Sequence, residues 1–188
     1  MATTNRTNPA SDMWHLSMEE LRARFYDFPS IPLHVHLGIT FEREHADGPA
    51  ICTLPASPDF TWPDGHQSHA AIYTIGEVSG GVAVSDFVVP HAVEVGKRPV
   101  ILTKKATFAP MARARGSMTG ECEVVGDYEA AVAKMKKRLK ADVDIGVTVY
   151  DEDRHAVGRC VLSYYVRLMD EERLQKMASL SGGMAGWS

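Results

Sequence analysis

The chain has 188 residues, of which 45% are apolar and 23% charged, and its formal net charge is -4 at pH 7. This length and composition are typical of one globular domain with its own buried core, and they exclude a disordered or fibrous chain. The mild acidity argues against nucleic acid as the main partner, because phosphate binding requires a basic surface.

The sequence also gives no sign of a membrane span or an export signal. The longest apolar runs, such as residues 82–84 and 87–89, are far shorter than the ~18 residues that a span needs, and the N-terminus lacks the apolar run of a signal peptide. Three cysteines, Cys52, Cys122 and Cys160, are too few and too scattered for a disulfide framework. We therefore expect a cytoplasmic protein with no membrane association.

Residues 1–12 are polar and without periodicity, which predicts a flexible tail. A helix is predicted to follow, because Ser17 and Glu20 have the spacing of a capping box. Pro29 and Pro32 are predicted to end it.

Two short runs, residues 37–45 and 50–54, are separated by an Asp-Gly-Pro turn sequence and predict a β-hairpin. Residues 68–84 differ from the rest of the chain, because almost every position is apolar or small. A helix without a polar face is a buried helix, and the three glycines in it imply that neighbouring backbone comes close. A loop is expected around residues 90–96.

Four more strands are predicted, with one amphipathic helix between the second and the third. These elements are strands 99–108 and 115–125, helix 128–139, and strands 143–150 and 156–168. Residues 169–188 are predicted to form a short helix and a glycine-rich tail. Antiparallel strands that each need one covered face would wrap the single apolar helix, so we predict one α+β domain over residues 13–168.

One acidic residue, Glu77, interrupts the apolar helix. A carboxylate among Ala, Gly, Ile and Val must be paired, protonated or used in chemistry. Burial would make Glu77 a proton acceptor near neutral pH, as a general base requires. The alternative is a buried structural acid that pairs with a lysine or arginine of the sheet.

Three stretches of the chain, residues 65–77, 104–110 and 149–167, resemble the hot dog thioesterase superfamily, in particular its PaaI-like and DUF4442 branch. Members of this superfamily usually carry a His-Gly-Gly or His-Ala-Gly motif nine residues before an Asp or Glu on the central helix. Counting back from Glu77 places Ser68 where that histidine would be. The chain therefore keeps the acid of the motif and departs from it at the histidine.

The resemblance implies a hot dog fold, an antiparallel sheet wrapped around a central apolar helix, in a homodimer or homotetramer. It implies hydrolysis of an acyl-CoA or acyl-carrier thioester, with coenzyme A as part of the substrate and with no separate cofactor. Glu77 would activate water or attack the carbonyl, and Ser68 would position the substrate or a water. The residues implied to contact the substrate are Gly65, His66, His69 and Ala70, with backbone amides near the last two polarising the carbonyl.

Other interpretations of the same residues stay open at this point. Ser68 is also an ordinary helix N-cap. His66 and His69 lie three residues apart but lack an accompanying Cys or Asp, so no metal site is predicted. The fold would also suit a non-catalytic acyl-binding protein, or a hydratase or dehydratase.

Overall fold

The computed structural model describes residues 28–43, 50–170, 172–174, 176 and 179. The predicted tail over residues 1–12 and the helix predicted to begin near Ser17 lie outside the described residues. Of the predicted C-terminal segment, residues 172–174, 176 and 179 are described and are helical.

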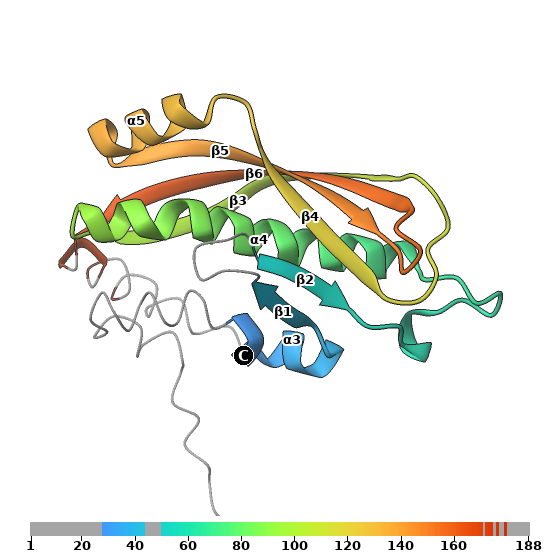
Figure 1. Ribbon diagram of the computed structural model, residues 1–188. Helices are drawn as coiled ribbons and strands as arrows, with labels where there is room; N and C mark the ends of the chain where they lie inside the picture. Colours follow the sequence, from blue (N-terminus) through green and yellow to red (C-terminus); the bar gives the residue numbers. More distant parts are fainter. Residues whose placement is uncertain (1–27, 44–49, 171, 175, 177–178, 180–188) are drawn as a thin grey trace, which may run out of the picture.

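Six antiparallel strands form one sheet in the order β1-β2-β4-β5-β6-β3 (Figure 1). All the strands predicted from the sequence are present, and the β1–β2 hairpin pairs Thr40 with Thr53. Along β6 buried residues alternate with half-buried ones, as the two-residue period of a strand requires. The strands are β1 (Thr40–Arg43), β2 (Ala50–Leu54), β3 (Arg98–Pro110), β4 (Met118–Val125), β5 (Lys140–Tyr150) and β6 (Ala156–Met169).

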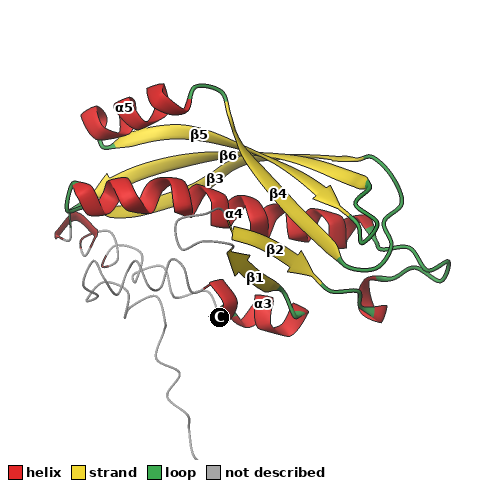
Figure 2. Ribbon diagram, viewed as in Figure 1, coloured by secondary structure: helices red, strands yellow, loops and turns green. Residues whose placement is uncertain are grey.

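The long helix α4 (His69–Glu94) packs against strands β2 to β6, and the sheet curves around it (Figures 1 and 2). Its buried residues, such as Ile72, Ile75 and Val82, form the core together with the inward side chains of the sheet. The predicted α+β class, with an antiparallel sheet wrapped around a central apolar helix, is confirmed.

Helix α4 continues through Pro90, where a loop was predicted, and this prediction is wrong. Pro90 is exposed, so water can bond the carbonyl that the missing proline N–H leaves free. Val88, Val89 and Ala92 around it are buried, and their packing stabilises the helix beyond the proline. By length and composition alone α4 is long and apolar enough to cross a membrane, but its apolar residues are those of a core helix inside the sheet.

Two of the three glycines of α4 lie where the helix touches the sheet. A Cβ atom added at Gly76 would lie 2.5 Å from Sγ of Cys160, and one added at Gly80 would overlap Leu162. A Cβ atom at Gly81 would meet nothing within 4 Å. Side chains of the sheet therefore come close at Gly76 and Gly80 but not at Gly81, and the predicted approach of neighbouring backbone is not confirmed.

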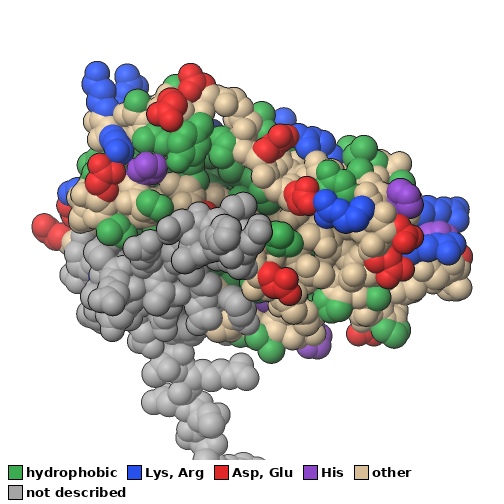
Figure 3. Space-filling view, in the orientation of Figure 1, with side chains coloured by type: hydrophobic (Ala, Val, Ile, Leu, Met, Phe, Trp, Pro, Cys, Tyr) green, Lys and Arg blue, Asp and Glu red, His purple; other side chains and the backbone are tan. Residues whose placement is uncertain are grey.

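Helix α5 (Tyr128–Arg138) packs mainly on β5 and touches the C-terminal part of α4, where the rings of Tyr128 and Phe87 lie 5.0 Å apart. Its predicted amphipathic character is confirmed, because Met135 is buried and the basic side chains are exposed. Lys136 pairs with Glu94 of α4 at 2.9 Å. On the face shown in Figure 3, basic and acidic side chains are interspersed.

Pro32 begins a short helix, α3 (Pro32–Leu37), and this position was not predicted. Proline suits the first position of a helix, where no N–H is needed and the fixed φ angle is already helical. The helix ends at Gly38, whose φ of 68° is left-handed. His34 of α3 is buried, and its Nδ1 lies 2.9 Å from the carbonyl oxygen of Phe28.

Candidate active site

Ser68 caps the N-terminus of α4. Its hydroxyl oxygen accepts a hydrogen bond from the amide of Ala71 at 3.2 Å, and its own amide donates to the carbonyl of Phe60 at 2.7 Å. The N-cap interpretation of Ser68 is therefore confirmed, because the hydroxyl satisfies one of the free amides at the helix start. A contact between this hydroxyl and a substrate stays a prediction.

We expect Ser68→Ala to lower the free energy of unfolding by about 1 kcal/mol, because the cap is lost. Ser68→Asp is the matched control, since an aspartate oxygen can accept the same hydrogen bond and should keep most of the stability. Chemical denaturation of the two variants measures the difference. Equal losses in both would show that the hydroxyl does not act as a cap.

Gly65 and His66 belong to a tight loop before α4. Gly65 has a φ of 83°, and its amide donates to the carbonyl of Trp62 at 2.8 Å. Nε2 of His66 lies 3.3 Å from Nε of Arg115, which can only donate, so Nε2 accepts and the ring proton lies on Nδ1. That Nδ1 lies 3.2 Å from a carboxylate oxygen of Asp64. Asp64 of the same loop and Arg115 of the β3–β4 connection thus lie on the two sides of the His66 ring.

Asp64 anchors this cluster. A hydrogen bond from the backbone amide of His66 is the main cause that lowers the pKa of Asp64, and the nearby charge of Arg113 adds to it. Asp64 is exposed, so the cluster orders the loop without burying a charge. A contact of Gly65 or His66 with a substrate stays a prediction.

His69 and Ala70 form the exposed first turn of α4. The His69 ring lies 6.5 Å from the ring of Phe108 on β3, and Tyr73 of the next turn lies 5.8 Å from the same ring. The first amides of a helix have no acceptor within the helix and lie at its positive end. The amides at His69 and Ala70 are therefore suited to polarise a carbonyl oxygen that approaches from outside.

Glu77 lies on the exposed side of α4, with Ala70, Tyr73 and Gly81 on the neighbouring turns. The prediction that Glu77 is buried is wrong for the single chain. The sheet covers only one side of α4, and the neighbours of Glu77 on the other side are uncharged, which makes the helix look apolar on all sides. No ion pair joins Glu77 to a lysine or arginine within the described parts of the chain.

The predicted site residues form two separate groups. From His69 to Glu77 the helix rises by about 12 Å, at 1.5 Å per residue. One thioester carbonyl cannot contact the helix N-terminus and Glu77 of the same chain. The structure therefore brings Gly65, His66 and Ser68 together with the first turn of α4, and it places Glu77 apart from them.

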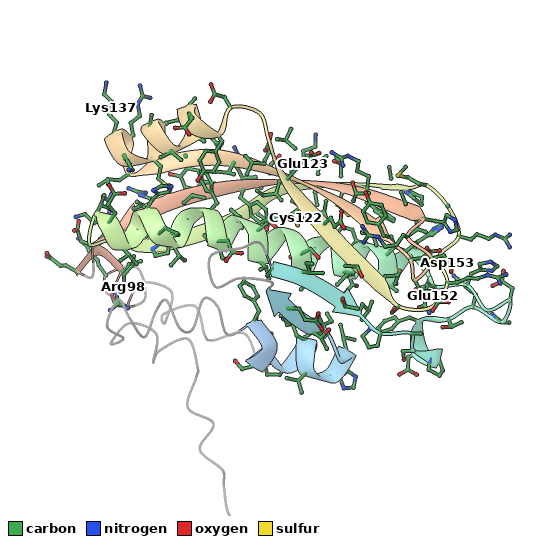
Figure 4. The ribbon with its side chains drawn as sticks, in the orientation of Figure 1. Arg98, Cys122, Glu123, Lys137, Glu152 and Asp153 are labelled. Carbon is green, nitrogen blue, oxygen red and sulfur yellow. The ribbon has the colours of Figure 1, made fainter. Side chains whose placement is uncertain are left out.

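The surroundings of Glu77 were not predicted from the sequence. Burial, and after it the charge of Glu77, raise the pKa of Tyr73 and raise the pKa of Cys160 to about 11. Burial also raises the pKa of Cys122 on β4 to about 12 (Figure 4). Both cysteines are therefore thiols at neutral pH and unsuited as nucleophiles.

A second polar cluster, also not predicted, lies in the turn between β5 and β6. Ligand atoms of Asp151, Asp153 and His155 lie within 4.8 Å of one another, and Asp153 is labelled in Figure 4. An oxygen of Asp151 accepts hydrogen bonds from the amides of Asp153 at 3.2 Å and His155 at 2.9 Å. These bonds explain the buried Asp151 as a support of the turn.

No protein-family model and no curated protein matches this sequence. Solved structures do match its fold. One is a protein of unknown function and probable thioesterase from Pseudomonas aeruginosa, with 20% identity over 81% of this chain and 97% of that chain and a TM-score of 0.59. Another is a thioesterase from Haemophilus influenzae, with 13% identity over 82% of this chain and 92% of that one and a TM-score of 0.56.

A mutant thioesterase from Pseudomonas aeruginosa matches at 13% identity, over 82% of this chain and 96% of that chain, with a TM-score of 0.55. These identities are low, so the likeness shows the fold alone. The chain has the hot dog fold that is found in thioesterase-superfamily structures.

Proposed function

We propose that this protein is a thioesterase that hydrolyses acyl-CoA or acyl-carrier thioesters. The observation that carries the proposal is the position of Glu77, an exposed acid among uncharged neighbours on the side of the central helix that the sheet of a hot dog fold leaves uncovered. The resemblance to the PaaI-like and DUF4442 branch supports the same substrate class. Coenzyme A would enter as part of the substrate, with no metal or separate cofactor, in the cytoplasm.

Hydrolysis needs a group that activates the nucleophile and donors that stabilise the developing oxyanion. Glu77 would accept a proton from water or attack the thioester carbonyl itself. The amides at His69 and Ala70 would donate to the carbonyl oxygen. His66, fixed by Arg115 and Asp64, and Gly65 would line the entrance beside the helix start.

The separation of about 12 Å between these two groups favours a site built from two subunits. One copy would supply the helix N-terminus and the other would supply Glu77. Strand β3 offers the surface for such pairing, because it is a 13-residue edge strand that pairs only with β6 in this sheet. A long exposed edge strand is a template for pairing with another strand, so we propose a homodimer through β3 or a homotetramer of two such dimers.

Light scattering on the purified protein tests the assembly. We expect at least twice the mass of the single chain, because the helix face with Glu77 and the edge of β3 are both exposed in one subunit. A monomer at micromolar concentration would contradict the two-subunit site.

Release of free thiol from acyl-CoA esters of several chain lengths and from an acyl-carrier thioester tests the activity. We expect catalytic turnover of at least one of these substrates. Binding of the acyl group without any release of thiol, across all substrates, would contradict hydrolysis.

Acyl binding without release of thiol would identify a non-catalytic acyl-binding protein. One observation favours this alternative: the residue at the position of the motif histidine is Ser68, and its hydroxyl caps the helix. A hydratase or dehydratase is less well supported, because relatives with that activity usually carry an Asp and His pair early in the helix, and only His69 is a candidate here.

A further inference from the structure

The hydroxyl group of Tyr164 is buried and has no hydrogen-bond partner among the described residues. Tyr164 lies in β6, and only 3% of its surface is exposed. Buried hydroxyl groups are nearly always hydrogen-bonded, because an unpaired one loses its bonds to water without replacement. Within the described part of the chain, the hydroxyl of Tyr164 therefore lacks the partner that a buried hydroxyl usually has.

Tyr164 points from the sheet toward α4. In β6 it occupies an inward position, paired with Val143 of β5 and with Thr103 of the edge strand β3. A Cβ atom added at Gly80 would lie 3.1 Å from its hydroxyl oxygen. Gly80 follows Glu77 by three residues, and residues at this spacing are neighbours on a helix surface. The hydroxyl thus lies under the helical turn next to Glu77.

Glu77 is the charged group that acts on Tyr164. The titratable groups that influence this tyrosine are Glu77 and Tyr73 of α4, Cys122 of β4 and Cys160 of β6. Tyrosine and thiol side chains are neutral near pH 7, whereas a glutamate is an anion. Burial, and after it the charge of Glu77, raise the pKa of Tyr164 well above its ordinary value. The hydroxyl therefore keeps its proton and remains a donor.

We propose that Tyr164 is a positioning residue, whose hydroxyl donates a hydrogen bond to the carboxylate of Glu77 once a partner subunit or a substrate covers this side of α4. The inference rests on the proposed function, in which Glu77 acts on the thioester. In the single chain Glu77 is exposed and can bond to water instead. Covering the helix removes that water, so the carboxylate of Glu77 needs a new donor. The hydroxyl of Tyr164 is a nearby donor without an acceptor, and the two groups can then bond to each other. One carboxylate oxygen would be held by Tyr164, and the other would face the reacting water.

Tyr164→Phe tests the proposal, with Tyr165→Phe as the matched control. Tyr165 is the next residue of the same strand, faces the other side of the sheet, and lies opposite Asp142 and Leu102. We expect Tyr164→Phe to lower kcat about ten- to hundredfold, as the loss of a hydrogen bond to a charged group would, with little change in KM. The acid limb of the pH–rate profile of Tyr164→Phe should move to higher pH. The carboxylate of Glu77 loses a hydrogen-bond donor in this variant, so it should take up a proton at a higher pH. Tyr165→Phe should change neither quantity.

A second measurement does not depend on turnover. Carbon NMR of the glutamate carboxyl groups in the intact oligomer, with Glu77→Gln to assign the signal, follows the titration of Glu77. We expect Tyr164→Phe to raise its midpoint by about one pH unit or more, and Tyr165→Phe to leave it unchanged. This shift without any thioesterase activity would overturn the proposed function and support the positioning role. Normal thioesterase activity with an unshifted titration would overturn the positioning role alone.

If Tyr164→Phe does not fold, a crystal structure of the wild-type oligomer decides. The expected separation between the hydroxyl oxygen of Tyr164 and a carboxylate oxygen of Glu77 is about 2.5–2.8 Å. A separation beyond about 3.5 Å would overturn the proposal.

Discussion

Replacing Glu77 with glutamine is expected to lower kcat for thioester hydrolysis by about 10²- to 10⁴-fold, the usual contribution of a general base. Glutamine keeps the size and polarity of the side chain but cannot accept a proton, so KM should change little. Steady-state kinetics with the preferred acyl-CoA ester measures both quantities. Glu77→Ala should show the same loss.

Glu94→Gln is the matched control for this prediction. Glu94 is the other glutamate of α4, it is exposed, and its partner is Lys136 at the surface. The kcat of Glu94→Gln should stay within about twofold of wild type, because most surface substitutions have small effects. Turnover that survives in Glu77→Gln would rule out Glu77 as the catalytic base or nucleophile.

The second large effect concerns adjacent glycines of α4. Gly80→Ala is expected to lower the free energy of unfolding by about 1–3 kcal/mol, because its new methyl group would overlap Leu162, which is fully buried and can shift only by disturbing the core. Gly81→Ala adds the same methyl group where nothing lies within 4 Å. It should raise the stability by up to about 1 kcal/mol, since alanine is the better helix former.

Chemical denaturation of the two variants gives this comparison directly. Equal changes in both would contradict the packing of α4 described above.

The strands could be predicted well from the sequence, and the reason is local. Turn sequences separate β1 from β2, and the two-residue period is clear in β6. The start of α4 was also predictable, because Ser68 is a strong capping residue. Pro90 was misjudged, since proline ends a helix only where its missing N–H and its ring conflict with the surroundings. The helix that begins at Pro32 was not predicted.

The site was predictable only in part. The spacing from Ser68 to Glu77 pointed to these two residues as candidates, but it did not show that Glu77 is exposed. Gly80 and Gly81 are the same residue type, and yet one touches the sheet while the other faces open space. A helix with small residues on both sides has no periodicity that separates the two. Tyr164 lies 87 residues after Glu77 in the chain, so only the fold brings it near.

The central claim is that each active site combines the helix N-terminus of one subunit with Glu77 of the other, and a hybrid dimer tests it most directly. One chain would carry Ala70→Pro, which removes the N–H at Ala70 at a position where a helix tolerates proline. The other chain would carry Glu77→Gln. Two different affinity tags allow purification of the mixed dimer, while each parent homodimer should be nearly inactive.

The mixed dimer has one intact site if the site is shared between subunits, and none if each chain forms its own. We therefore predict about half of the wild-type thioesterase activity per dimer. A mixed dimer as inactive as both parents would contradict the shared site.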